Sequence, residues 1–115
     1  MKYLLSIYAN EAAENAMPPE TLGKVMQAYG AYTDALTQAG VLQGAERLRP
    51  STDATSVRVR NGKTEVLNGP YAETREQLGG YYLIDVPDLD AALTWAARCP
   101  SSGHGTIEVR PIWEM

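Results

Sequence analysis

Residues 81–98 read Tyr-Tyr-Leu-Ile-Asp-Val-Pro-Asp-Leu-Asp-Ala-Ala-Leu-Thr-Trp-Ala-Ala-Arg and predict a strand followed directly by a helix. The first six residues are mostly apolar, with the aromatic and β-branched side chains that strands favour. Asp88 then precedes an amphipathic run, as a helix N-cap does. The spacing predicts a helix over 89–98 that Cys99-Pro100 ends. Its inward-facing residues are expected to be Leu89, Ala92, Leu93 and Ala96.

The same order of strand and helix occurs at the start of the chain. Residues 2–8 are apolar on both faces, which is typical of a central strand. A polar loop leads to Pro18-Pro19, which can open a helix predicted over 20–39. The apolar stripe of that helix consists of Leu22, Val25, Met26, Tyr29, Thr33 and Leu36. Further strands are predicted over 41–48 and 106–113, and Gly44 predicts a bulge in the first of them.

The sequence Arg60-Asn61-Gly62-Lys63 predicts a β-hairpin. An Asn-Gly pair between alternating residues is typical of a two-residue turn with positive φ. This turn fixes the register, so that Val57 pairs with Val66 and Val59 with Thr64 on one face. Arg58 and Glu65 then form an opposite-charge pair on the other face, and such a pair contributes roughly 0.2–1 kcal/mol. Residues 68–80 are predicted to be irregular.

These elements predict an α+β fold. With the hairpin set aside as an insertion, the order is βαββαβ, the ferredoxin-like pattern. The chain of 115 residues is expected to form a single domain over residues 1–115, with a radius of gyration of about 13 Å. The helices cover only one face of such a sheet. We therefore expect a homodimer in which the other faces pair, giving a dimeric α/β barrel.

Composition excludes several functions. The net charge of −4 argues against nucleic-acid and anionic-membrane partners, which need a positive surface. The chain shows no targeting signal and no apolar run long enough to span a membrane, so we expect a cytoplasmic protein. One Cys and one His, with scattered carboxylates, lack the spacing of a metal site. No cofactor is predicted, because no Gly-rich phosphate motif follows a strand.

The segment 68–86 reads Asn-Gly-Pro-Tyr-Ala-Glu-Thr-Arg-Glu-Gln-Leu-Gly-Gly-Tyr-Tyr-Leu-Ile-Asp-Val. It resembles the YCII-related proteins, and within them the branch named for an Asp-Gly-Pro-Phe (DGPF) motif. The opening residues 1–8 and the ending Glu108-Val109-Arg110-Pro111 are similar to this family as well. The resemblance implies a dimeric ferredoxin-like fold with a pocket on each protomer. Annotation also links members of this branch to extracytoplasmic sigma factors, a link that the acidic charge here does not support.

The chain departs from the branch at three positions. Asn68 stands where the branch has Asp, and Tyr71 where it has Phe. An Asp can transfer a proton, whereas Asn can only donate and accept hydrogen bonds. Arg75 replaces a Lys, which keeps the charge but presents a planar fork. These changes bear directly on any chemistry carried by the motif.

Six residues are candidates for a functional site. Glu73 and His104 are the candidate catalytic acid–base groups, because carboxylates and imidazoles are the usual carriers of protons. The alternative for both is an exposed, solvated loop. The candidate ligand-binding residues are Tyr8, Asn68, Tyr71 and Arg75.

Two functions remain open. In the first, the rigid turn Asn68-Gly69-Pro70-Tyr71 borders a pocket for an unidentified small polar metabolite, with cofactor-independent acid–base catalysis. In the second, the protein is a non-enzymatic regulatory or partner-binding module. The second draws on Asn68 in place of a carboxylate and on the lack of a recognisable catalytic constellation.

Overall fold

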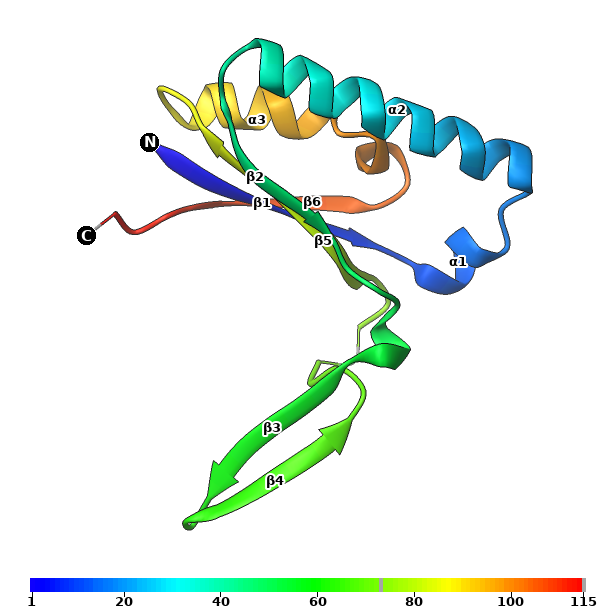
Figure 1. Cartoon of the computed structure of the whole chain (residues 1–115), viewed down its shortest axis with the longest axis vertical. Helices are drawn as coiled ribbons and strands as arrows, with labels where there is room; N and C mark the ends of the chain where they lie inside the picture. Colours follow the sequence, from blue (N-terminus) through cyan, green and yellow to red (C-terminus); the bar gives the residue numbers. More distant parts are fainter. Residues whose placement is uncertain (73, 115) are drawn as a thin grey trace.

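The computed structural model describes residues 1–72 and 74–114. Four antiparallel strands form a sheet in the order β2-β5-β1-β6. Their bounds are Lys2–Ala9 for β1, Leu42–Arg47 for β2, Gln77–Asp85 for β5 and Thr106–Pro111 for β6. Helices α2 (Pro19–Gln38) and α3 (Leu89–Arg98) lie together on one face of this sheet (Figure 1). The fold is therefore α+β, and it is broadly consistent with the ferredoxin-like pattern.

The core lies between the sheet and these two helices. Alternate residues of β1 point into it, and Tyr3, Leu5 and Ile7 are all buried. Leu36 from α2 and Ile84 from β5 are completely buried against them. The rings of Tyr32 and Tyr82 meet edge to face, with centroids 5.1 Å apart. Such an arrangement is favourable for aromatic rings, and it joins α2 to the centre of the sheet.

Helix α3 has the predicted bounds, and its predicted cap is confirmed. The Asp88 carboxylate accepts a hydrogen bond from the Ala91 amide at 2.9 Å. The predicted inward face is partly wrong, because Leu89 and Leu93 are 48% and 47% exposed. Ala92 and Ala96 form the buried stripe instead. Their small side chains let the helix lie close to the sheet, with the two leucines turned to solvent.

Helix α2 also differs from its predicted stripe. Tyr32, which the periodicity did not single out, is buried, whereas Leu22 and Met26 are exposed. The C-terminal half of α2 packs on the sheet, while the N-terminal half borders a pocket described below. Leu22 and Met26 therefore do not contact the core, because the pocket lies below the N-terminal half of the helix.

The strands differ from the prediction in two places and confirm it in a third. β5 begins at Gln77, inside the segment predicted to be irregular, because Gln77 pairs with Ala9 at the end of β1. β6 ends at Pro111, which leaves Trp113 exposed beyond it. The register of β2 shifts between Leu42 and Gly44, so the predicted bulge is confirmed.

The predicted polar loop contains a short helix, α1 (Glu11–Asn15), whose N-terminus is capped by the Asn10 side chain. Two short 3₁₀ turns complete the chain, η1 (Ser51–Asp53) and η2 (Pro100–Gly103). Both turns lie in connections where a proline precedes or opens the turn.

Strands β3 (Thr55–Arg60) and β4 (Lys63–Asn68) form the predicted hairpin, which we call the arm (residues 55–68). Asn61 and Gly62 have φ values of 53° and 75°, as the turn requires. The predicted register is confirmed, and Arg58 Nε lies 2.5 Å from Glu65 Oε2. The arm projects from the rest of the molecule (Figure 1). It raises the radius of gyration to 16.0 Å, so the expected value near 13 Å is wrong.

Candidate functional site

A pocket lies between the N-terminal half of α2 and the sheet, and we call it the helix–sheet pocket. Its volume is about 300 Å³, at the lower end of the range of small-molecule sites. Most of its surface is apolar. The apolar lining residues are Ile7, Ala9, Leu22, Val25, Met26 and Ala45. The exposed leucine and methionine of α2 thus form one wall of a cavity rather than part of the core.

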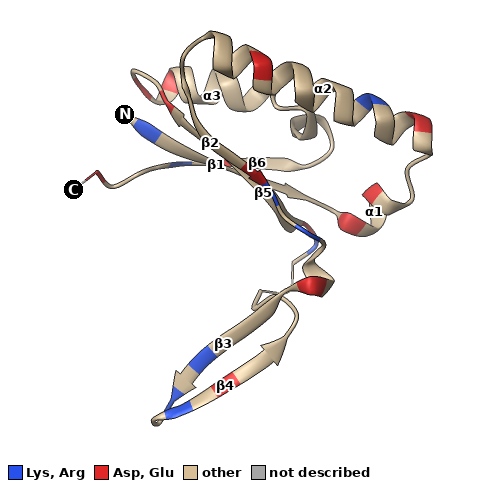
Figure 2. Ribbon diagram, in the orientation of Figure 1, with Lys and Arg blue, Asp and Glu red and all other residues tan. Residues whose placement is uncertain are grey.

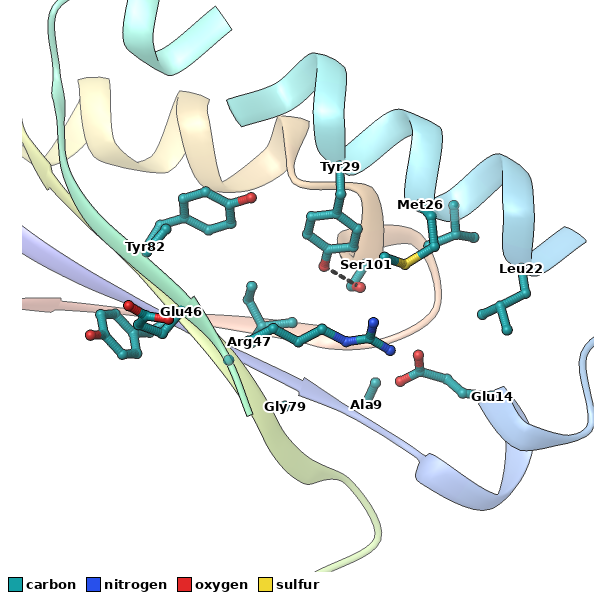
Figure 3. Close-up of a pocket in the computed structure, with 15 residues that line it drawn as sticks. Ala9, Glu14, Leu22, Met26, Tyr29, Glu46, Arg47, Gly79, Tyr82 and Ser101 are labelled. Carbon is teal, nitrogen blue, oxygen red and sulfur yellow. Dashed lines mark hydrogen bonds between the residues drawn. The ribbon is translucent and has the colours of Figure 1, made fainter. Parts of the chain in front are cut away.

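The inner wall of this pocket carries two hydroxyl groups in contact. Tyr29 Oη lies 2.5 Å from Ser101 Oγ and 3.6 Å from the sulfur of Cys99 (Figure 3). Burial raises the pKa of the Tyr29 phenol, and the hydrogen bond from Ser101 only partly offsets it. Burial also raises the pKa of the Cys99 thiol. Both groups therefore stay protonated at neutral pH and act as hydrogen-bonding groups rather than as a base or nucleophile.

A second hydroxyl pair extends this polar wall. Thr33 Oγ1 donates to the Tyr29 carbonyl oxygen at 2.9 Å and lies 2.7 Å from Tyr82 Oη. Since the threonine proton is already used, the Tyr82 hydroxyl must donate to Thr33. Burial raises the pKa of Tyr82 as well. The hydroxyls of Tyr29 and Tyr82 are thus fixed in place before any ligand enters.

Two opposite charges stand at the rim of the pocket. The side chains of Arg47, at the end of β2, and Glu14, on α1, extend toward each other across its opening (Figure 3). Arg47 takes part in none of the ion pairs found among the described residues. Glu46 also borders the pocket, but its side chain points away from it (Figure 3). The rim therefore offers one cation and one anion to a ligand.

The position of Glu14 depends on a neighbouring carboxylate. Glu11 Oε1 accepts from the Ser51 amide at 2.8 Å, and Oε2 accepts from the Ser51 hydroxyl at 2.6 Å. The Glu11 amide in turn donates to Gln77 Oε1 at 3.0 Å. These bonds tie α1 to η1 and to the start of β5, and so they hold Glu14 at the pocket rim.

Gly79 and Gly80 of β5 line the floor of the pocket. A Cβ at Gly80 would lie 2.7 Å from the Glu46 carbonyl oxygen, so only glycine allows β2 to approach this closely. The structure shows that the partner in that approach is the backbone of β2, with the pocket directly beside it.

A second, more open hollow lies where β1 and β6 meet the segment before β5, and we call it the strand-end hollow. Its lining residues are Tyr8, Asn10, Thr74, Arg75, Glu76, Thr106 and Glu108. Thr106 Oγ1 donates to Glu76 Oε1 at 2.7 Å across it. It brings together Tyr8 and Arg75, two of the predicted ligand-binding residues.

The other predicted site residues lie elsewhere. Asn68 and Tyr71 are exposed and line neither the helix–sheet pocket nor the strand-end hollow. Gly69 between them has a φ of 96°, a left-handed value that glycine readily adopts. His104 is exposed at the end of η2. Glu73 lies outside the described residues.

The residues that form the helix–sheet pocket were not predicted as a site. Tyr29 entered the sequence analysis only as part of a helix stripe, and Arg47 and Glu14 were not assigned a role. One signal was present, because the stripe of α2 mixes Tyr29 and Thr33 with aliphatic residues. Hydroxyls on an otherwise apolar helix face need partners, and here they find them beside a cavity.

Two structural features bear on other functions. Within residues 1–72 and 74–114, the structure places no three His, Cys, Asp or Glu side chains where they could share a metal ion. Among the described helices, none has the length and apolar character needed to cross a membrane.

Fold and pocket together define a small α+β protein with a mostly apolar pocket between helix and sheet. Comparison with known families matches residues 1–115 to the YCII-related domain. The chain therefore belongs to the YCII-related family. It is also similar to an uncharacterised protein of Rhizobium meliloti (strain 1021), with 39% identity over 114 residues that cover 97% of this chain and 92% of that protein.

Proposed function

We propose that this protein binds a small molecule with an apolar body and one charged head group in the helix–sheet pocket. The observation that carries the proposal is the pairing of an apolar cavity of about 300 Å³ with Arg47 and Glu14 at its rim. A pocket of this size holds a small ligand, and a few placed polar groups fix the orientation of that ligand. The Tyr29 and Ser101 hydroxyls offer a hydrogen bond at the far end.

The charge expected for the ligand's head group depends on the two charged side chains at the pocket rim, Arg47 and Glu14. An acid would pair with the planar guanidinium of Arg47, and an amine would pair with the Glu14 carboxylate. Neither Arg47 nor Glu14 joins an ion pair among the described residues, and we favour an acid because a guanidinium can hold a carboxylate with two parallel hydrogen bonds. Binding rather than turnover is favoured, because burial holds the Tyr29 hydroxyl of the inner wall, and the Cys99 thiol next to it, in their neutral forms.

The test is a thermal-shift screen with three matched sets of small apolar compounds that carry an acid, an amine or no charge. A ligand present at 100 times its Kd adds about 2.7 kcal/mol to the free energy of unfolding, which is readily measured. We expect the acids to stabilise the wild type and to lose this effect in Arg47→Ala. The matched control is Arg49→Ala, since Arg49 is highly exposed and makes only a surface ion pair with Asp53.

Two further variants define the site. Met26→Trp adds bulk at the wall of the pocket and should abolish stabilisation by every set, whereas Glu14→Gln should affect only amines. Stabilisation that survives Met26→Trp, or that Arg49→Ala removes as strongly as Arg47→Ala, would contradict the proposal. A ligand recovered unchanged after incubation indicates binding, and one consumed over time indicates an enzyme.

The strand-end hollow supports a second candidate, a site for a small polar metabolite. The specific observation is that Tyr8 and Arg75 line it together, although they are far apart in the sequence. The proposed acid–base group of this second candidate remains Glu73, an assignment that comes from the sequence alone. Arg75→Ala and Glu73→Gln would remove this binding or turnover while leaving ligands of the helix–sheet pocket unaffected.

We also propose that the protein forms a homodimer through the sheet face opposite the helices. Residues that point to that face include Leu4, Tyr8 and Leu83, which are only half-buried in one chain. Pairing two such faces would give the dimeric α/β barrel expected from the sequence, with a two-fold axis between the sheets. Leu83→Lys places a charge at the proposed contact and should shift the protein to a monomer in light scattering.

A further inference from the structure

The arm is placed to reach beyond its own chain. It forms a separate two-stranded sheet, and it extends from the ends of β2 and β5 on the side away from α2 and α3 (Figure 1). This is the side of the open sheet face. A two-stranded ribbon is only marginally stable by itself in water, so a ribbon that projects in this way gains stability from any surface that covers it.

One face of the arm is apolar and uncovered. Val57 and Val66 are directly paired across the two strands, and Val59 lies on the same face. The three valines are 66%, 65% and 58% exposed. The opposite face carries the Arg58–Glu65 ion pair. The turn would allow polar residues at these positions, so three exposed valines on one face of a projecting ribbon, with Thr64 opposite Val59, indicate a contact surface.

Charge indicates what the arm contacts. Three basic residues and one acidic residue give the arm a net charge of +2, so the remainder of the chain carries −6. The basic residues Arg60 and Lys63 flank the turn at the tip, whereas acidic residues are spread over α1 and α2 (Figure 2). When two copies meet, the basic arm of one is therefore electrostatically complementary to the acidic remainder of the other.

We propose that the arm clasps a second copy of this chain, with its valine face packed on the partner and its basic tip on the partner's acidic surface. The inference rests on the proposed homodimer. By two-fold symmetry each copy gives one arm and receives one. The arm alone is too small for a stable interface, which buries about 800 Å² on each partner, so the arms add to the contact between open sheet faces.

The test compares dimer dissociation constants, measured by sedimentation equilibrium, between variants on the two faces of the arm. The triple variant V57T/V59T/V66T keeps the β-branched shape and the strand but removes the apolar face. We expect its Kd to rise at least about tenfold, since a few central contacts carry most of the affinity of an interface. Leu67→Thr, on the opposite face of the same ribbon, is the matched control and should leave the Kd unchanged.

A second pair of variants tests the charge argument. Lys63→Glu and Lys24→Glu change the net charge equally, but Lys24 lies on the exposed side of α2. Lys63→Glu should raise the Kd several-fold and reduce its dependence on salt, whereas Lys24→Glu, which adds to the acidic surface of α2, should leave the Kd unchanged or lower it. Equal effects of the two would show that overall charge, rather than the arm, controls association.

The outcomes separate the arm from the dimer. A wild type that stays monomeric at high micromolar concentration overturns both proposals. If Leu83→Lys dissociates the dimer and the triple valine variant does not, the arm inference is wrong and the dimer through the sheet stands. Hydrogen exchange of the wild type is an independent check, because the amides of β3 and β4 should exchange more slowly as dimer forms. Exchange in the arm that is independent of concentration would also overturn the inference.

Discussion

Gly105, just before β6, is a position where a single methyl group has a large predicted effect. A Cβ at Gly105 would overlap the carbonyl oxygen of Tyr8 and would lie 3.2 Å from the carbonyl oxygen of Ser101. Both obstacles are backbone atoms, which cannot rotate away as a side chain could. Gly105→Ala must therefore push η2 away from β1, and overpacking of this kind costs about 1–3 kcal/mol.

The assay is thermal unfolding followed by circular dichroism, with Gly103→Ala as the matched control. An unfolding entropy of about 2.1 cal/mol/K per residue converts the expected loss in Gly105→Ala to a fall in Tm of about 4–12 °C. Gly103 has no atom within 4 Å of an added Cβ. Its alanine variant should be neutral or more stable by up to about 1 kcal/mol, since alanine restricts the unfolded chain. Equal Tm changes in the two variants would refute the packing of η2 against β1.

Two further predictions concern the core and its tyrosines. Leu36→Ala should lower the free energy of unfolding by about 2–5 kcal/mol, because Leu36 is 0% exposed. Leu93→Ala, on the outer face of α3, should lower it by less than about 0.5 kcal/mol. Urea denaturation measures both values. Burial raises the pKa of Tyr29 and of Tyr32 above the ordinary value near 10. Below about pH 10 these phenols are protonated in both the folded and the unfolded protein, so their burial stabilises the fold fully. Above about pH 10 they ionise first in the unfolded chain, and the free energy of unfolding should therefore fall as the pH rises. Absorbance titration and urea unfolding from about pH 9 to 11.5 measure this, and a free energy of unfolding that stays constant over that range would contradict the burial of the two rings.

The features that the sequence predicted well are those set by local chemistry. The Asn61-Gly62 turn fixed the hairpin register to the residue, because only a turn with positive φ at both positions joins two strands in so short a loop. Asp88 fixed the start of α3 in the same way, because its side chain accepts a hydrogen bond from the amide three residues further along the chain.

The candidate site was predicted far less well, because its residues meet only through long-range pairing. Tyr29 and Ser101 are 72 positions apart and touch only because α2 and η2 lie on the same face of the sheet. Tyr8 and Arg75 share a hollow because β1 pairs with both β5 and β6. Asn68 and Tyr71 carry the most distinctive motif of the chain, yet they lie on and beside the projecting arm.

The sequence by itself determined where the turn, the caps and most strand and helix bounds fall, since each depends on a few neighbouring residues. The tertiary structure alone decided which side of each helix meets the sheet. Leu89 and Leu93 are exposed because the alanines of α3 pack on the sheet, and Leu22 and Met26 border a pocket because that end of α2 has no core below it. Burial depends on what the rest of the chain places opposite a side chain, and the period of a helix does not contain that information.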